Sequence, residues 1–229
     1  MKRRIIITSA VVILVIGVVI LLLPFIYQVR YDSERNEIIE NFEVDINDSS
    51  NNELLEELYR KLLDENERLY LEGQRELKDP FSYENQGIDL TYYGIEDNTI
   101  GYITIPDIDI TLPIYLGASE DNMTKGAVHL TQTSYPIGGA NSNSVIAAHR
   151  GYYKAKMFKD INMISVGDEV YIRNFRETLL YIVKEIKVIN PNQVEEVMIN
   201  EGEDMLTLIS CHPYGKSTFR YVVYCKRYE

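Results

Sequence analysis

An uncharged apolar run near the N-terminus is the feature that most limits what this chain can fold into. Residues 5–27 contain no charged side chain, and at about 1.5 Å of rise per residue a helix of that length crosses a hydrocarbon core of about 30 Å. Residues 2–4 are all basic, and short basic flanks remain on the cytoplasmic side. The sequence therefore predicts a single-pass transmembrane helix, with everything after Arg30 outside the cell.

A cleaved signal peptide is the alternative explanation of this run. A signal peptide has a shorter apolar core and a cleavage site of small residues, whereas residues 24–27 are Pro, Phe, Ile and Tyr. An uncleaved anchor is therefore favoured.

The rest of the chain is acidic. Residues 1–30 hold four of the 23 basic residues and none of the 35 acidic ones, so residues 31–229 carry 19 basic against 35 acidic residues, a net charge of −16. Nucleic-acid binding depends on clustered Lys and Arg, and this balance argues against a nucleic-acid partner.

Two regions of different amino-acid composition follow the predicted anchor. Residues 31–78 are polar and rich in Glu, with a capping box predicted at Ser50 and Glu53. Four leucines after it follow helical spacing: Leu55, Leu58, Leu62 and Leu69. The pattern predicts an amphipathic helix that packs on the next domain, with a stalk from the bilayer as the alternative.

From Ile100 onward, short β-branched and aromatic runs alternate with Gly, Pro, Asn and Asp, which is typical of an antiparallel sandwich or barrel. Seven strands are predicted: 101–105, 108–114, 144–149, 169–173, 178–188, 205–211 and 220–224.

Three chemically useful side chains lie where predicted strands end. Residues 207–211 indicate a buried strand that ends at the thiol of Cys211, and residues 212–215 must then turn. Arg220 begins the next strand, so a hairpin would bring its guanidinium near the sulfur. His149 ends another strand at a second corner. If neighbouring strand ends align, the three side chains meet at one rim.

These residue types fit acyl transfer. A thiolate attacks a carbonyl, a histidine moves the protons, and a fixed cation stabilises the oxyanion and lowers the thiol pKa. Singly, each of the three is more often structural. Papain-like hydrolases also use Cys and His, but there the nucleophile precedes the histidine, whereas His149 precedes Cys211. The other cysteine, Cys225, is predicted to be a core residue of the last strand.

Short motifs around these three residues narrow the class of enzyme further. Residues 207–211, with Arg220 downstream, resemble the Thr-Leu-x-Thr-Cys…Arg signature of sortases, and residues 148–151 resemble their histidine motif. Further stretches resemble class C, the pilin-polymerising sortases: 129–139, 149–158 and 211–215. The resemblance covers roughly residues 79–226.

This resemblance implies a mainly β fold: an eight-stranded sortase β-barrel with an N-terminal helical extension and one transmembrane helix. Residues 1–30 would form the cytoplasmic tip and anchor, 31–99 the extension and lid segment, and 100–229 the catalytic barrel. Class C members carry an Asp-Pro-aromatic lid, which Asp79, Pro80 and Phe81 match. Asp79 would pair with Arg220, and Phe81 would cover Cys211, although the tripeptide could also simply stop a helix.

The implied activity is that of a cysteine transpeptidase at the surface of a Gram-positive cell. Cys211 would form a thioester with an LPxTG-like sorting signal, His149 would act as general acid and base, and Arg220 would clamp substrate and oxyanion. The accepting amine would be a pilin lysine, in pilus assembly, or a cell-wall precursor peptide; the chain stops at Glu229 without the second span that class C members often have. A pilus-associated structural protein is the non-enzymatic alternative. No metal or organic cofactor is required.

Two positions near the catalytic residues depart from the class C pattern. His212 stands where Thr is usual, and Phe219 stands where His is common. Because adjacent strand residues point apart, His212 is expected to face solvent rather than tune the thiol. His129, within a matched motif, is expected to form hydrogen bonds in its loop.

Overall fold

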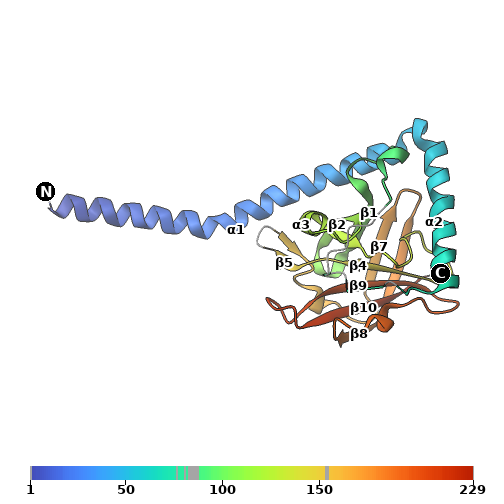
Figure 1. Cartoon of the computed structure of the whole chain (residues 1–229). Coiled ribbons are helices and arrows are strands. Elements are labelled where there is room, and N and C mark those ends of the chain that lie inside the picture. The colour runs from blue at the N-terminus through green and yellow to red at the C-terminus, as the bar shows by residue number, and fades with distance from the viewer. Residues whose placement is uncertain (1, 76, 80, 82–87, 153–154, 229) are drawn as a thin grey trace.

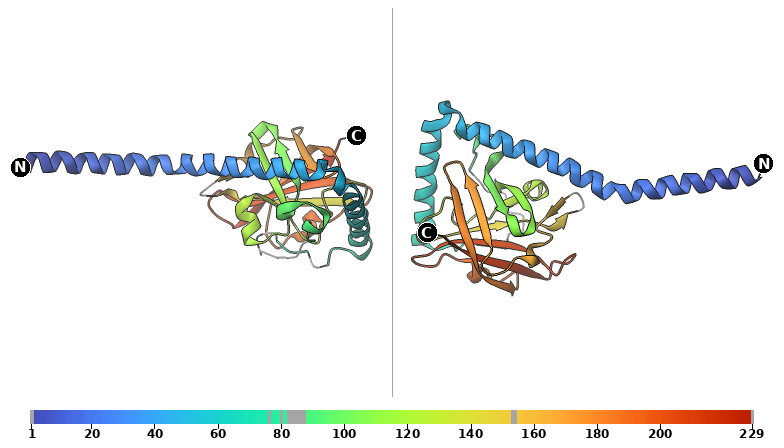
Figure 2. Two further views of the ribbon diagram at one scale, coloured as in Figure 1. Left: turned by 90° about the horizontal axis from the view of Figure 1, so that it is seen from above. Right: turned by 180° about the vertical axis from the view of Figure 1, so that it is seen from behind.

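A long N-terminal helix extends from a β-barrel, and a second helix lies along the opposite side of that barrel in the computed structural model (Figure 1). The structure describes residues 2–75, 77–79, 81, 88–152 and 155–228. Figure 2 shows the long helix passing over one side of the barrel before the chain turns into the second helix.

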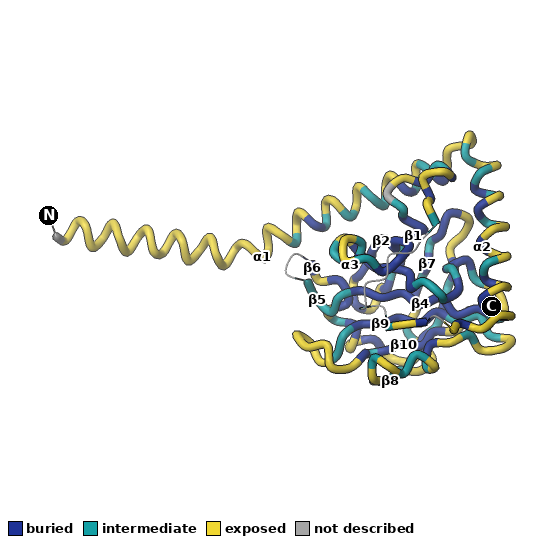
Figure 3. The backbone as a smooth tube through the Cα atoms, viewed as in Figure 1, coloured by how far each residue is buried: buried dark blue, intermediate teal, exposed yellow. Residues whose placement is uncertain are grey.

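The first helix, α1 (Lys2–Asn47), joins the apolar run to the barrel without a break, although it contains Pro24. Its apolar part is exposed, whereas Tyr31, Phe42 and Ile46 are buried against the domain (Figure 3). Within the described part of the chain it is the one helix long and apolar enough to cross a membrane. Residues 31–47 therefore continue the apolar helix, which the sequence pattern does not predict, and the amphipathic helix predicted from the leucine spacing begins after them.

The chain turns between the two helices through a short 3₁₀ helix, η1 (Ser49–Asn51). The Asp48 carboxylate accepts a hydrogen bond of 2.9 Å from the Ser50 amide, and Asn51 occupies the N-cap position of the next helix without a side-chain cap. The predicted capping box of Ser50 and Glu53 is wrong, because Asp48 takes the Ser50 amide and starts the turn earlier.

Helix α2 (Asn52–Glu72) packs its apolar stripe on the barrel, as the leucine spacing predicts. All four leucines are buried, and the Asn66 carboxamide accepts a hydrogen bond of 2.7 Å from the Tyr135 amide. Residues 52–72 are therefore a packed helix and not a free stalk.

Eight strands close the barrel in the order β1-β2-β3-β4-β9-β10-β8-β7, which confirms the predicted fold. The pairs β2–β3 and β4–β9 are parallel. The barrel strands are β1 (Thr99–Ile105), β2 (Ile110–Leu116), β3 (Ala127–His129), β4 (Ser142–Ala147), β7 (Glu169–Asn174), β8 (Thr178–Ile189), β9 (Asp204–His212) and β10 (Phe219–Arg227). Seven of them correspond to predicted strands; β3 has only three residues and gives too short an apolar pattern to be recognised.

Short elements fill the connections. A hairpin of β5 and β6 stands apart from the barrel. These elements are α3 (Glu120–Lys125), β5 (Arg150–Tyr152), β6 (Ala155–Met157), and the 3₁₀ helices η3 (Thr91–Tyr93), η4 (Glu96–Asn98), η5 (Pro106–Ile108), η6 (Ile161–Met163) and η7 (Val194–Val197).

Apolar side chains of the barrel strands form two clusters because successive residues of a strand point to opposite faces. The inner cluster takes residues from all eight strands, among them Ile146, Leu208 and Val223. The outer cluster takes their neighbours Ala147, Ile209 and Val222, and Leu77 and Phe81 cover it from the segment before the barrel. The outer face of β4, β9 and β10 is therefore buried beneath that segment.

Replacing Phe42 by alanine should loosen α1 from the barrel. Phe42 is 2% exposed and meets the edge of Tyr102 with ring centroids 6.3 Å apart. Truncating such a buried ring costs about 3 kcal/mol of unfolding free energy, measurable by chemical denaturation of the full chain in detergent. Val44→Ala is the matched control, since Val44 is 64% exposed on the same helix. Equal losses for the two variants would show that α1 does not pack on the barrel.

Candidate active site

The side chains of Cys211, Arg220 and His149 lie on the outer face of the barrel. Strand alternation decides this, because residues two apart share a face. Each is two residues from a member of the outer cluster: Ile209, Val222 and Ala147, respectively.

Strand register places the same three residues at one height. Cys211 is directly opposite Arg220 in the β9–β10 pair. In the parallel β4–β9 pair Ala147 is opposite Ile209, and the Ala148 amide continues the ladder by donating to the Ile209 carbonyl at 3.2 Å. His149 follows at once and is therefore level with Cys211. The three predicted residues come together at one end of the barrel.

The guanidinium of Arg220 forms an ion pair with the carboxylate of Asp79. Asp79 Oδ1 accepts from Nε at 2.6 Å and Oδ2 from Nη2 at 2.7 Å, a bidentate pair. The side chains are 7% and 18% exposed, so solvent screens this ion pair weakly. The third nitrogen, Nη1, donates to the carbonyls of Ser217 and Phe219.

Phe81 covers the groups beside Cys211. The Arg220 guanidinium carbon lies 4.8 Å from the centre of the Phe81 ring, and the His149 ring centre lies 6.0 Å from it. The His149 ring also stacks on the ring of Tyr152, with the two ring centres 5.6 Å apart. Asp79 and Phe81 thus sit where the resemblance places a lid, while Pro80 lies outside the described residues.

Burial sets the protonation of the site. It raises the pKa of the half-buried Cys211 thiol; Asp79 raises that pKa further, and Arg220 and Arg150 lower it. Burial also lowers the pKa of His149. The covered site therefore holds a thiol and a neutral imidazole near neutral pH, and its thiol is a poor nucleophile.

Arg150 links the histidine corner to the strand that ends at Cys211. Its Nη1 donates to His212 Nδ1 at 2.7 Å and to the Cys211 carbonyl at 3.5 Å, and its Nη2 donates to Asn162 Oδ1 at 2.6 Å. His212 is half-buried, and it accepts from Arg150 rather than facing solvent alone. Sequence reasoning missed Arg150, and its only signal is the position next to His149.

The remaining histidine and cysteine are structural. His129 is 1% exposed and its Nε2 donates to the Ser134 carbonyl at 3.1 Å, which confirms the expected role in its loop. Burial lowers its pKa to about 4. Cys225 is fully buried in the inner cluster and is not in a disulfide, as expected of a core residue. Among the described residues no group of three or more His, Cys, Asp or Glu could hold a metal ion.

Comparison with known proteins identifies the family of this chain. A family model described as the sortase domain matches residues 103–228. The chain belongs to the sortase family. Among solved structures this sortase is similar to sortase C1 of GBS pilus island 1, with a TM-score of 0.75, 32% identity, and coverage of 85% of this chain and 92% of that one. It is also similar to Streptococcus pneumoniae sortase C, with a TM-score of 0.75, 36% identity, and coverage of 84% and 97%.

Curated relatives agree with that assignment over a shorter segment. Sortase A of Bacillus anthracis is 30% identical over 124 residues, which are 54% of this chain and 57% of the relative. The chain spans about half the length of the curated relatives it matches. Since the similar solved structures are sortases C, the resemblance to class C is confirmed.

Proposed function

We propose that this sortase is a cysteine transpeptidase that cleaves an LPxTG-like sorting signal and joins its acyl group to an amine. The observation that supports it best is the shared height and face of Cys211, His149 and Arg220 on neighbouring strands. A nucleophile, a proton carrier and a fixed cation at one point are what acyl transfer through a thioester requires.

The chemistry follows from these groups. His149 takes the proton of the Cys211 thiol, and the thiolate attacks the scissile carbonyl. A C–S bond forms as the carbonyl π pair moves onto oxygen, and the oxyanion lies against the Arg220 guanidinium. His149 gives a proton to the departing amine as the C–N bond breaks, which leaves a thioester. An incoming amine then attacks, His149 takes its proton, and the thiolate leaves as the new amide forms.

A pilin lysine is the accepting amine we propose, with a cell-wall precursor peptide as the alternative. The support is similarity: one solved relative comes from a pilus island, and the study of another concerns pilin substrate specificity. We further propose that residues 1–30 anchor the chain in the membrane, that 31–99 form the extension and lid, and that 100–229 act outside the cell.

Asp79 and Phe81 form a lid in this proposal. The closed lid buries the thiol and engages the guanidinium that the substrate oxyanion needs, so substrate and lid compete for one site. Opening would remove both influences that raise the Cys211 pKa, namely burial and Asp79, and would leave Arg220, which lowers it.

Asp79→Ala should therefore speed alkylation of Cys211 by a small thiol reagent, about tenfold or more near neutral pH. Because a lower thiol pKa means more thiolate at a given pH, the alkylation-rate profile should also shift to lower pH. The measurement is the rate of adduct formation at Cys211, followed by mass spectrometry across a pH series.

Two variants separate the parts of this lid. Asp79→Asn keeps the size of the side chain but not its charge, and Phe81→Ala removes the cover but keeps the ion pair. Both should react faster than the unmodified chain. An alkylation rate that none of the three substitutions changes would exclude a lid at this segment.

The test of the proposed function is incubation of the full chain in detergent with sorting-signal peptides, with and without an amine acceptor. We expect a mass increase on Cys211 equal to the acyl fragment, and then an amide product when lysine-containing pilin or a wall peptide is added. Cleavage products without any adduct on Cys211 would contradict the thioester route, and the preferred amine distinguishes pilus assembly from wall anchoring.

A further inference from the structure

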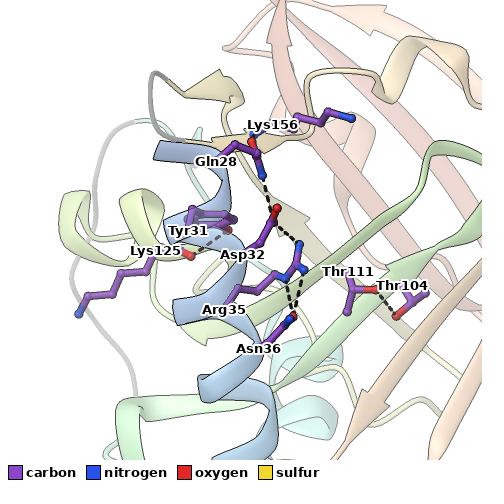
Figure 4. A network of polar contacts seen from close by, with 9 residues as sticks. All are labelled: Gln28, Tyr31, Asp32, Arg35, Asn36, Thr104, Thr111, Lys125 and Lys156. Carbon is purple, nitrogen blue, oxygen red and sulfur yellow. Dashed lines mark hydrogen bonds and ion pairs between the residues drawn. The ribbon is translucent and has the colours of Figure 1, made fainter. Parts of the chain in front are cut away.

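Helix α1 contacts the β5–β6 hairpin and the end of α3 directly after its apolar run ends. Gln28 accepts a hydrogen bond of 3.0 Å from the backbone amide of Lys156, and the Tyr31 hydroxyl donates to the Lys125 carbonyl at 3.0 Å (Figure 4). The uncharged run ends at Tyr27, so both contacts lie within about one helical turn of the bilayer edge. In a membrane-anchored chain the β5–β6 hairpin and the end of α3 are therefore at headgroup height.

Four exposed side chains lie on the β5–β6 hairpin, directly after it and on the turn between β9 and β10: Lys156, Lys159, Tyr214 and Lys216, which we call the junction patch. The Lys159 amide donates to the Lys156 carbonyl at 2.9 Å. A Cβ atom added to Gly151 of β5 would lie 3.0 Å from Tyr214 Cε2 and 3.6 Å from Lys159 Cγ. The turn between β9 and β10 therefore packs closely against the hairpin. Figure 1 shows β5 at the end of the barrel from which the free part of α1 extends.

The charge of the patch differs from that of the domain around it. Residues 31–229 have a net charge of −16, yet the patch contributes three lysines. Of the neighbouring carboxylates, Asp32 at the junction pairs with Arg35 at 2.8 Å, and Asp160 follows Lys159 in the chain. The ion pairs of lysines between described residues use Lys125, Lys187 and Lys226, and none uses a patch lysine. Lysines beside a tyrosine are typical of surfaces that meet anionic headgroups, where the aromatic ring sits at the interface.

We infer that the junction patch contacts the anionic lipid headgroups of the bilayer that holds α1. This inference rests on the membrane topology proposed above. The contact turns one end of the barrel toward the membrane. Because Cys211 is the penultimate residue of β9 and Tyr214 lies in the turn that follows that strand, the active-site end is the end that faces the lipid surface.

Tryptophan reporters test this orientation, since the chain contains no tryptophan of its own. Tyr214→Trp places a reporter in the patch and Tyr228→Trp places one near the C-terminus, and the two tyrosines are similarly exposed, at 59% and 61%. The full chain is reconstituted in phosphatidylglycerol nanodiscs that contain a headgroup nitroxide quencher. The patch reporter should be quenched at least about twofold more than the C-terminal reporter.

Charge reversal identifies the headgroups as the cause. Reversing the three patch lysines to Glu should reduce quenching of the Tyr214→Trp reporter to the level of the Tyr228→Trp reporter, and phosphatidylcholine discs should weaken it in the same way. A control with the same total charge change should keep the strong quenching: Arg60→Glu, Arg75→Glu and Lys226→Glu.

Equal quenching of the two reporters would overturn the inference, and so would quenching that neither the patch lysines nor the lipid charge alters. Thioester formation with a sorting peptide is measured on the same discs. Differential quenching without any thioester would count against the proposed function alone, whereas thioester formation with equal quenching would count against the patch alone.

Discussion

Replacing Cys211 by alanine should abolish thioester formation with a sorting-signal peptide, with no acyl adduct detectable by mass spectrometry. The substitution removes the nucleophile, and no other described side chain at that height of β9 carries a thiol, since Cys225 is fully buried on the opposite face. The loss in turnover should be at least about 10³-fold, because covalent catalysis has no second route in this site.

The matched control is Cys225→Ala, which removes the other thiol of the chain. Neither cysteine forms a disulfide, so this variant should keep the acyl adduct and lose only packing in the inner cluster. Thermal unfolding of both variants checks that the barrel is intact. Turnover retained by a folded Cys211→Ala variant would remove the catalytic proposal.

Replacing Arg220 by alanine should lower the rate of transpeptidation by about 10²–10³-fold, the usual cost of removing an oxyanion donor. The variant also loses the positive charge that lowers the Cys211 pKa. That pKa should therefore rise, so less thiolate is present at a given pH and the pH–rate profile should move to higher pH. The measurements are kcat, KM and the pH dependence of kcat/KM with a sorting peptide.

A second explanation of such a loss is structural, because Arg220 also holds Asp79. Asp79→Ala frees the lid and keeps the guanidinium, so this variant should be active, and the Asp79→Ala/Arg220→Ala double variant should remain slow. If the double variant turns over as fast as Asp79→Ala alone, Arg220 serves only to close the lid.

Both predictions reflect one physical conflict. The guanidinium of Arg220 can face the Asp79 carboxylate or a developing oxyanion, and its Nε and Nη2 already donate to Asp79 in this structure. The same closure buries Cys211 and keeps it protonated near neutral pH. In the proposed mechanism a single ion pair thus withholds the nucleophile and the cation together, and we expect substrate to displace it.

The sequence by itself determined the features that depend on local pattern. The long apolar helix follows from an uncharged run, seven barrel strands follow from β-branched alternation, and α2 follows from leucine spacing. The positions of Cys211, His149 and Arg220 next to predicted turns were also readable, because strand ends carry their own signal in Gly, Pro and turn residues.

Only the tertiary structure decided what distant segments do to one another. It joined the apolar run and residues 31–47 in one helix, gave the Ser50 amide to Asp48, and placed His212 in a hydrogen bond with Arg150. It also laid Leu77 and Phe81 over the outer face and set the Gln28–Lys156 contact directly after the apolar run. These outcomes depend on contacts between residues far apart in the chain or on competition for one hydrogen-bond donor, and no local periodicity records either.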